Sequence, residues 1–260
     1  MNWRAAAQRA RDLAQTLPAT ADLLVFYAAV IDAQASVAAR LGALAERGGL
    51  TGVLAADAVH VREGLADLLR AVDAHGPEPL RRGVVELRHA EDAAIDEMLI
   101  DYWTTPSDLQ FFAKALLQPY ARALADASQA PRERSFVPVD NCCPFCGGPP
   151  QVATFHAASA SGDGGRRLHC ALCLTAWPFR RILCARCGEE DERKVGYYEM
   201  PGFDHVSVEA CDVCRHYLKC VDLGRLGLAV PLVDEVAAST LDVWAHERGF
   251  IKIERNLIGL

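Results

Sequence analysis

The chain has 260 residues, a net charge of −7 at neutral pH and ten cysteines. This length allows one large or two modest domains, with enough apolar side chains for a core. The acidic charge argues against a dedicated nucleic-acid binder, which is usually basic. The N-terminus lacks the apolar run of a signal peptide, and the most hydrophobic stretch, Leu23 to Leu44, is interrupted by Asp32 and Arg40. We therefore expect a cytoplasmic protein with no membrane span.

The first 130 residues show only helical patterns. A helix is expected over 3–17 and a long one after it, which Thr20 can cap and Gly48-Gly49 can end. Further helical patterns run over 53–74 and 84–101. The last of these has an acidic face, which we expect to be solvated, with partner binding as the alternative. That face consists of Glu91, Asp92, Asp96, Glu97 and Asp101.

Another helix is predicted to start at the sequence Thr105-Pro106-Ser107-Asp108, because Thr105 can cap it and Pro106 suits a first helical position. Pro119 should kink this helix, since proline removes one backbone hydrogen bond. No strand pattern precedes residue 135. Residues 1–130 are thus predicted to form an all-α helical bundle, and 131–141 to form a linker.

Eight of the ten cysteines form four Cys-x-x-Cys pairs: Cys143/Cys146, Cys170/Cys173, Cys184/Cys187 and Cys211/Cys214. A shift of 41 residues places the first two pairs on the last two, which indicates a tandem repeat. Gly147 and Gly188 follow the first pair of each repeat, where a tight turn of positive φ is expected. Two matched pairs at equal separation are strong evidence for a metal site.

Each repeat can hold one metal ion with four thiolates, which suits zinc or a single iron. The spacing favours Cys143, Cys146, Cys170 and Cys173 on one metal, and Cys184, Cys187, Cys211 and Cys214 on the other. An interleaved pairing and a set of four disulfides are the alternatives, although disulfides would need an oxidising compartment. A site filled by four thiolates leaves no open position for hydrolysis, so we expect a structural or electron-relay role.

Other candidate groups surround the cysteine pairs. Cys142 and Cys220 are interpreted as small core residues, with a nucleophilic role as the alternative. His169 and His216 could donate to ligand thiolates or lie free on the surface. Five arginines make the first repeat locally basic, which favours a solvated or protein-facing role: Arg166, Arg167, Arg180, Arg181 and Arg186. We found no phosphate loop, nucleophile elbow or His-Glu-x-x-His motif, so no enzyme class is indicated.

The segments around the cysteines alternate apolar and polar residues. Strands are predicted at 151–156 and 194–199, with a hairpin tip at 162–165, a helix over 232–248 and a strand-like tail over 250–255. The predicted fold is therefore α+β and multidomain. It has a helical bundle over 1–130, a linker over 131–141, rubredoxin-like or zinc-ribbon units over 142–181 and 182–222, and a C-terminal helix and tail over 223–260 that pack at the domain junction.

The motifs resemble those of the formate dehydrogenase accessory protein family FdhE. The resemblance is carried by Cys143-Pro-Phe-Cys-Gly, Leu168-His-Cys-Ala-Leu-Cys, Cys184-Ala-Arg-Cys-Gly, and Glu209-Ala-Cys-Asp-Val-Cys followed by Tyr217-Leu-Lys219. The segment Phe111 to Tyr120 and the ending around Leu241-Asp-Val-Trp244 are similar too. The match is good over residues 100–260 and only general before that. The chain is also shorter than is typical for the family.

The resemblance implies a cytoplasmic, non-enzymatic factor. Members of the family act during maturation on the molybdenum- or tungsten-containing catalytic subunit of respiratory formate dehydrogenases, which would make that subunit the partner. It also implies iron in the rubredoxin-like sites, with zinc as the alternative. Two alternative hypotheses are a nucleic-acid-binding zinc-ribbon protein and a rubredoxin-like electron carrier. The sequence does not determine the oligomeric state.

Overall fold

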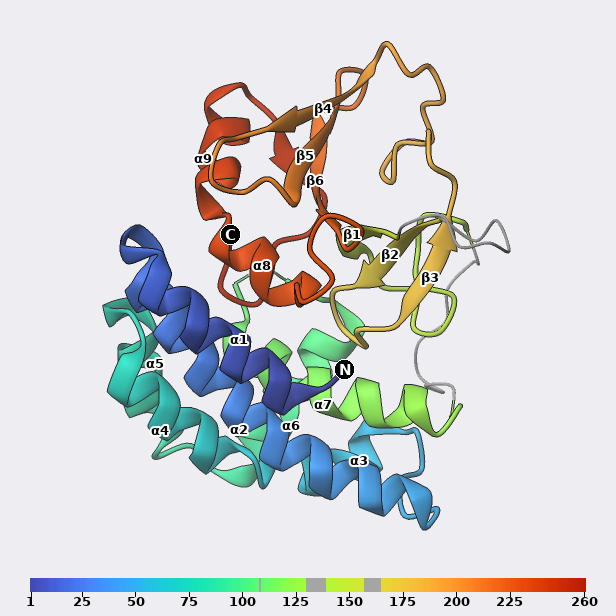
Figure 1. Ribbon diagram of the computed structural model, residues 1–260. Helices are drawn as coiled ribbons and strands as arrows, with labels where there is room; N and C mark the ends of the chain where they lie inside the picture. The colour runs from blue at the N-terminus through green and yellow to red at the C-terminus, as the bar shows by residue number, and fades with distance from the viewer. Residues whose placement is uncertain (108, 130–138, 157–164) are drawn as a thin grey trace. The chain divides into compact units, whose positions relative to one another are not determined.

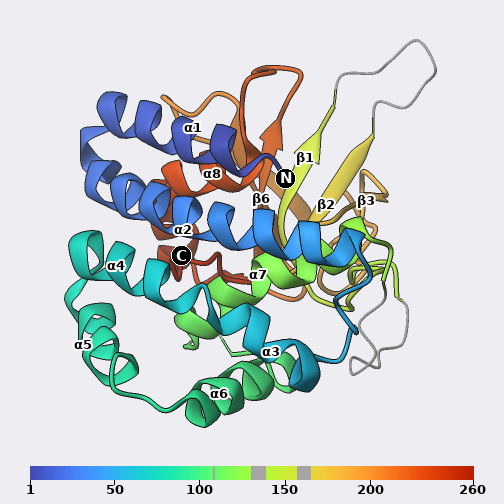
Figure 2. The same ribbon diagram turned by 90° about the horizontal axis from the view of Figure 1, so that it is seen from below.

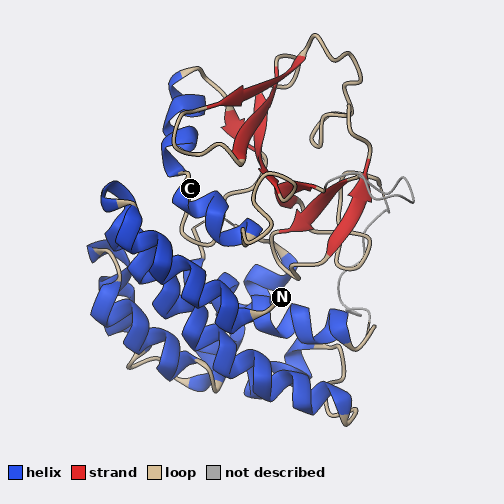
Figure 3. Ribbon diagram, in the orientation of Figure 1, coloured by secondary structure: helices blue, strands red, loops and turns tan. Residues whose placement is uncertain are grey.

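The computed structural model describes residues 1–107, 109–129, 139–156 and 165–260. Its residues divide into two compact units, one made of the N-terminal part with Leu172–Leu174 and Gly259, and one made of the rest. Within the described ranges, the N-terminal part contains helices only and every strand lies in the second unit (Figure 3). The fold is therefore α+β. The linker predicted at 131–141 and the hairpin tip predicted at 162–165 lie largely outside the described residues.

The helical unit is organised around its longest helix, α2 (Ala21–Glu46), which packs against α1, α4 and α7 (Figure 2). By length and composition alone, the segment Pro18–Glu46 could cross a membrane. Leu24, Val30, Ile31 and Leu41 are nevertheless fully buried among the neighbouring helices. The segment is thus the core helix of this unit. The other helices are α1 (Trp3–Thr16), η1 (Pro18–Thr20), α3 (Leu54–Arg62), α4 (Leu65–His75), α5 (Glu78–Leu87), α6 (Asp92–Thr104) and α7 (Phe111–Asp126).

Two buried hydrogen-bonded contacts join helices that are distant in sequence. Gln34 on α2 donates to the Ala115 carbonyl at 2.8 Å and to Gln118 at 2.9 Å, both on α7. The Asp57 carboxylate on α3 accepts a 2.8 Å hydrogen bond from the Tyr120 hydroxyl. Because these polar groups are buried, each would be costly if it lost its partner. The contacts therefore specify how α3 and α7 are placed in the unit.

The single helix predicted over 53–74 is wrong, because the structure has two helices, α3 and α4, separated at Glu63-Gly64. Gly64 lies directly against α2, and a Cβ atom built on it would be 2.3 Å from Cγ2 of Val37. Only a glycine permits this close approach. The chain therefore bends at the point where it meets the core helix, which helical periodicity does not reveal.

Two other predicted helix boundaries also differ from the structure. The pattern over 84–101 is divided between α5 and α6, and α5 begins directly after Pro77. Thr105 does not start a helix but ends α6, consistent with the restriction that Pro106 places on the residue before it. The next helix, α7, begins at Phe111 and continues through Pro119. Asp108, the last residue of the predicted start sequence, lies outside the described residues.

The acidic face predicted around α6 is partly paired. The guanidinium of Arg62 lies 3.0 Å from the Asp92 carboxylate and 2.5 Å from that of Asp96. These contacts join α3 to α6 inside the helical unit. At least these two carboxylates thus have an intramolecular partner, which reduces the negative charge that the face can offer to another protein.

Among its described residues, the second unit contains one sheet of seven strands. Its order is β3-β2-β1-β6-β5-β4, with the short β7 paired to β6 (Figure 1). The strands are β1 (Pro150–Phe155), β2 (Arg166–Cys170), β3 (Ala176–Phe179), β4 (Val195–Glu199), β5 (Val206–Cys211), β6 (His216–Asp222) and β7 (Ile251–Lys252). The strands predicted at 151–156 and 194–199 correspond to β1 and β4. Each begins an antiparallel pair, with β2 and β5 respectively.

The two repeats meet where β1 of the first pairs with β6 of the second. This pair is parallel and aligns Val152 with Lys219 and Phe155 with Asp222. The sequence repeat predicts two tandem units. It does not predict that the units share one sheet, because parallel pairing between segments about seventy residues apart leaves no local signal.

The segment after β6 folds back onto the sheet. The single helix predicted over 232–248 is wrong, because the structure has α8 (Pro231–Ala237) and α9 (Ser239–Glu247), interrupted at the buried Ala238. Helix α8 packs on β1 and β6, and α9 packs on β5 and β7. In the predicted tail strand, Ile251 and Lys252 pair with β6 as β7, and the Ile253 amide donates to the Tyr217 carbonyl at 3.0 Å. The predicted packing at the domain junction stays a prediction.

Candidate metal centres and the residues beside them

The structure gathers the eight paired cysteines into two clusters. One consists of Cys143, Cys146, Cys170 and Cys173, and the other of Cys184, Cys187, Cys211 and Cys214. Within each cluster all Sγ atoms lie within 4.8 Å of one another. This is the grouping that the spacing favours, and the interleaved pairing is not the one observed. All ten cysteines are free thiols, so the alternative set of four disulfides is not the arrangement observed.

Tight turns position the thiols. In the first turn of each repeat, the amide of Gly147 donates to the Cys143 carbonyl at 2.9 Å and that of Gly188 donates to the Cys184 carbonyl at 3.0 Å. Both glycines have positive φ, +71° and +76°, as the sequence predicts. The second turns end at Leu174 and Arg215, which adopt φ of 57° and 59° without being glycine. Sequence reasoning missed these two positions because their side chains carry no turn signal.

The sulfur positions fit a tetrahedral metal. Bonds of about 2.3 Å from a central zinc to four sulfurs put the sulfurs about 3.8 Å apart. The Sγ distances are 3.4 Å for Cys146 to Cys170, 3.7 Å for Cys184 to Cys214 and 3.8 Å for Cys187 to Cys211. Two such clusters suggest two metal ions, and soft thiolates suit zinc or iron equally well. With four sulfurs bound, neither centre would have an open position for a substrate.

The two clusters differ in their exposure to solvent. All four cysteines of the first cluster are buried. In the second, Cys187 is exposed and Cys214 is half-buried. The repeat in sequence therefore does not produce equivalent sites, because the packing around each cluster is different.

The residues beside the ligand cysteines have other partners. His169 lies 3.1 Å from the Thr154 hydroxyl, and burial lowers its pKa to about 4. His216 lies 2.7 Å from the backbone carbonyl of Cys214 through its Nδ1 atom. Cys220 is buried in the sheet and Cys142 is partly buried, outside both clusters. The contacts described for the two histidines are thus to a hydroxyl and a carbonyl rather than to a thiolate.

A buried ion pair crosses the boundary between the repeats. Arg166 on β2 donates to the Glu209 carboxylate on β5 at 2.7 Å, and both side chains are almost fully buried. The Tyr197 hydroxyl donates to the other oxygen of Glu209 at 2.7 Å. Arg166 also donates to the Leu183 carbonyl at 2.8 Å. Removing one partner would leave an uncompensated charge in the interior.

The locally basic surface predicted around the first repeat is smaller than its sequence indicates. Arg166 is internal, Arg180 forms an ion pair with Glu190, and Arg167 donates to the Ala176 carbonyl at 2.9 Å. Arg181 lies over the Phe155 ring, 5.6 Å from its centroid. Several of the arginines that a nucleic-acid-binding protein would use are therefore engaged within the chain.

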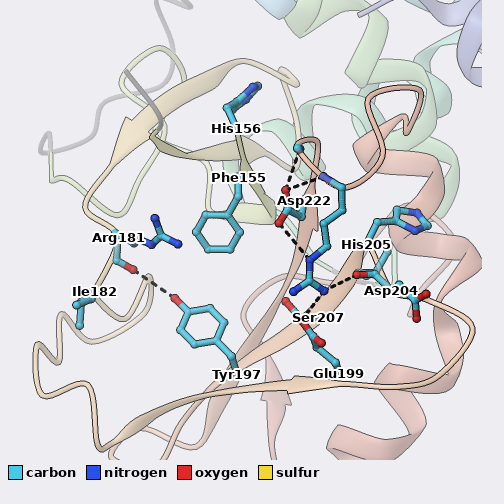
Figure 4. A pocket seen from close by; sticks show the side chains of 13 residues that line it. Phe155, His156, Arg181, Ile182, Tyr197, Glu199, Asp204, His205, Ser207 and Asp222 are labelled. Atoms are coloured by element: carbon cyan, nitrogen blue, oxygen red, sulfur yellow. Dashed lines mark hydrogen bonds and ion pairs between the residues drawn. The ribbon is translucent and has the colours of Figure 1, made fainter. Parts of the chain in front are cut away.

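A cavity of about 570 Å³ opens where the two repeats adjoin. Phe155 and Tyr197 face one another there, with ring centroids 6.1 Å apart, and Arg181 lies beside them (Figure 4). On the opposite side, Arg225 bonds to Glu199 at 2.7 Å and to the Asp204 carbonyl at 2.6 Å. The lining is thus mixed in charge, with aromatic, acidic and basic side chains.

A second buried polar cluster explains the Tyr217-Leu-Lys219 segment. The Lys219 ammonium, fully buried, contacts the carboxylates of Glu235 and Asp242 and donates to the carbonyls of Glu235 and Ala238. Tyr217 donates to Asp242 at 2.7 Å. Glu235 lies in the last turn of α8, where backbone carbonyls lack an intrahelical partner, so its carbonyl can accept from the ammonium. Lys252 and Asn256 complete the cluster through Glu235.

This cluster was not predicted from the sequence. Its two lysines and two carboxylates balance in charge, which is the usual condition for burying ionic groups. Its members come from β6, α8, α9, β7 and the tail, so no local spacing reports it. The cluster attaches the C-terminal helices to the sheet that carries the cysteine turns.

Comparison with family models places the same region in one protein family. Residues 142–181 match the model "FdhE, central domain", and residues 182–258 match "FdhE, C-terminal domain". The boundary between the two models falls where the two sequence repeats meet.

Individual relatives agree. A "Protein FdhE homolog" from Aquifex aeolicus is 34% identical over 195 residues, which cover 74% of this chain and 68% of the relative. Another from Haemophilus influenzae is 27% identical over 267 residues, covering 95% of this chain and 84% of the relative. The crystal structure of the FdhE protein from Pseudomonas aeruginosa superposes with a TM-score of 0.67 at 23% identity, covering 98% of this chain and 94% of that one. That likeness shows a shared fold.

Proposed function

Because the chain belongs to the FdhE family, we propose that it is an accessory protein that binds the catalytic subunit of a respiratory formate dehydrogenase in the cytoplasm and is needed for its active assembly. The observation that carries this proposal is the pair of four-cysteine clusters in the segments that match the two FdhE models. Both clusters are closed sets of ligands, which favours a binding factor over a metal-dependent hydrolase.

The eight cysteines are the proposed metal ligands, one ion per cluster. Iron is favoured by the family resemblance, and the sulfur geometry accepts zinc as well. In either case each metal would stabilise the folded second unit. It would join a turn that precedes the first strand of its repeat to a turn that follows the second strand. The protein would thus present a rigid sheet to its partner.

The test is a co-purification from the native host. The tagged protein should capture the formate dehydrogenase catalytic subunit, and a deletion strain should make the subunit but lack formate dehydrogenase activity. A catalytically active subunit in the deletion strain would contradict the proposal. Salt-dependent binding to DNA or RNA, with no capture of the subunit, would instead favour the hypothesis of a nucleic-acid-binding zinc-ribbon protein.

A further inference from the structure

The two repeats allow a comparison of equivalent strands. Strand β4 of the second repeat is equivalent to β1 of the first. Val195 pairs with Cys211, and Pro150 pairs with Cys170, which lies 41 residues before Cys211. By the same register, Tyr197 corresponds to Ala153 and Glu199 corresponds to Phe155. The outer edge of β1 is covered by β6, whereas β4 ends the path of the sheet.

The backbone groups that face this outer edge follow from the hydrogen bonds. The Asp212 amide donates to the Lys194 carbonyl at 2.8 Å, so Lys194 and Asp212 form a hydrogen-bonded pair. Backbone groups alternate in direction along an antiparallel strand. Gly196 and Tyr198 therefore bond to β5, and Tyr197 and Glu199 direct their amides and carbonyls away from it.

The first repeat shows what such an edge accepts. The Ala171 amide donates to the Pro149 carbonyl at 3.1 Å, the equivalent of the bond in the second repeat. On the outer side, the Phe155 carbonyl accepts a 2.9 Å bond from the Leu223 amide, which follows β6. Phe155, the equivalent of Glu199, thus uses its outward carbonyl to bind the residue that follows β6.

The outer edge of β4 has no such cover. Among the described residues, the backbone of Val195–Glu199 bonds only to β5, and Tyr197, Tyr198 and Glu199 are exposed where the equivalent part of β1 is mostly buried. The strand also lacks the lysine or proline that commonly protects an edge. We propose that this edge, Val195–Glu199, binds an extended segment of the partner protein as a further strand of the sheet.

The geometry of the other free edge argues against a second copy as the occupant. Within the chain, β1 of the first repeat pairs with β6 of the second. Strand β4 is equivalent to β1, and β3 is equivalent to β6. The same pairing between two copies would therefore join β4 of one copy to β3 of the other. Strand β3 ends at Phe179 and contains Pro178, which has no amide to donate. Strand β3 has four residues against seven in β6, and it lacks the Pro178 amide, so it cannot pair with β4 as β6 pairs with β1. This excludes the same pairing between two copies, so we take a separate polypeptide segment as the occupant. Pairing of β4 with β4 of a second copy is an outcome that the test below distinguishes.

The chemistry of the segment follows from the exposed side chains. Tyr197 and Tyr198 lie on opposite faces of β4 and are 45% and 36% exposed. Tyr198 packs against Trp244 in a tilted arrangement, with ring centroids 4.6 Å apart. An added strand would gain from apolar or aromatic side chains beside each tyrosine. Main-chain bonds would then supply affinity, and these side chains would supply selectivity.

This inference rests on the proposed function, since the partner used to test it is the formate dehydrogenase catalytic subunit of the host. The test compares two variants of one residue in the full-length chain. Glu199→Pro removes an amide directed to the free edge, whereas Glu199→Ala keeps the amide. Both variants lose the side-chain contact with Arg225 equally. The proline leaves the partner carbonyl unpaired and obstructs its approach, so we expect about tenfold weaker capture of the subunit by Glu199→Pro.

Glu199→Ala should capture about tenfold more subunit than Glu199→Pro, and both variants should keep the metal content and thermal unfolding of the wild type. Overlapping short peptides covering the subunit should include an extended, apolar segment that binds the wild type and not Glu199→Pro. Equal capture by the two variants would overturn the inference and leave the proposed function standing. No capture by the wild type would overturn both. If Glu199→Pro instead abolishes a dimer seen by sedimentation, the edge joins two copies and the inference is wrong.

Discussion

The two units of this protein differ in how they are stabilised. The helical unit has a conventional apolar core around α2, and its few buried polar groups are mostly neutral, such as Gln34 and Gln118. The part of the chain after residue 138 buries six of the eight clustered cysteines and many ionic side chains. The buried ionic side chains are Arg166, Glu209, Lys219, Asp234, Glu235, Asp242 and Lys252. One unit is held by apolar burial, and the other by paired charges and, in our proposal, by metal at the two cysteine clusters.

This difference predicts how each unit should respond to substitution. Apolar cores lose stability gradually, in proportion to the surface or volume removed. Metal sites and buried ion pairs lose it abruptly, because an unpaired ligand or charge is left in the interior. The largest effects should therefore arise in the sheet unit.

Cys170→Ser should have the largest effect. Cys170 belongs to the fully buried cluster, and structural metal sites of this type contribute about 10–16 kcal/mol of apparent binding free energy, more than the whole stability of many domains. We expect loss of one metal and loss of amide protection throughout the sheet, while α1 to α7 stay protected in hydrogen exchange.

Cys142→Ser, which alters a cysteine outside both clusters, is the control and should leave metal content unchanged. Because β1 and β6 are paired, we expect both repeats to lose protection together. If only residues 142–181 lost protection, the repeats would fold separately in spite of the shared sheet.

Cys187→Ser should have a smaller effect than Cys170→Ser. Cys187 is exposed, so water can replace the missing thiolate and the other three sulfurs can hold the metal more weakly. The sheet should stay folded when metal is in excess, and a chelator should remove one equivalent of metal faster than from the wild type. Metal analysis during chelation measures this, and equal rates of release would show that exposure does not distinguish the clusters.

Lys219→Met should destabilise the sheet unit by about 3–5 kcal/mol, because it leaves the carboxylates of Glu235 and Asp242 buried without the ammonium. Urea denaturation followed by tryptophan fluorescence should show a lower midpoint, with metal still bound before unfolding. Lys194→Met is the matched control, since Lys194 is half exposed and its Nζ lies 3.6 Å from Glu189. A similar loss in both variants would argue against the buried cluster.

Gly64→Ala should give the smallest loss, about 1–3 kcal/mol, and only in the helical unit. The new methyl group would be 2.3 Å from the Val37 side chain, so α2 and α4 would have to separate. Gly42→Ala, inside α2 with no atom within 4 Å of the added carbon, should instead stabilise by up to about 1 kcal/mol. Thermal unfolding followed at 222 nm would distinguish the two, and an unchanged midpoint for Gly64→Ala would contradict the packing argument.

The sequence by itself determined the features that depend on local spacing. The cysteine spacing indicated the two clusters, because two Cys-x-x-Cys turns at equal separation in each repeat can supply four thiolates to one site. Alternation predicted β1 and β4, and periodicity predicted that the N-terminal part is helical. Gly147 and Gly188 showed where tight turns of positive φ occur.

The tertiary structure alone decided the features that depend on distant segments. The division at Gly64 follows from contact with Val37 on another helix, and the division at Ala238 accompanies the contacts of Lys219 on β6. The parallel pairing of β1 with β6, the unequal exposure of the two clusters and the open edge of β4 have the same origin. Hydrogen bonds and burial between residues far apart in the chain are set by how the elements pack, and no periodicity in either segment records them.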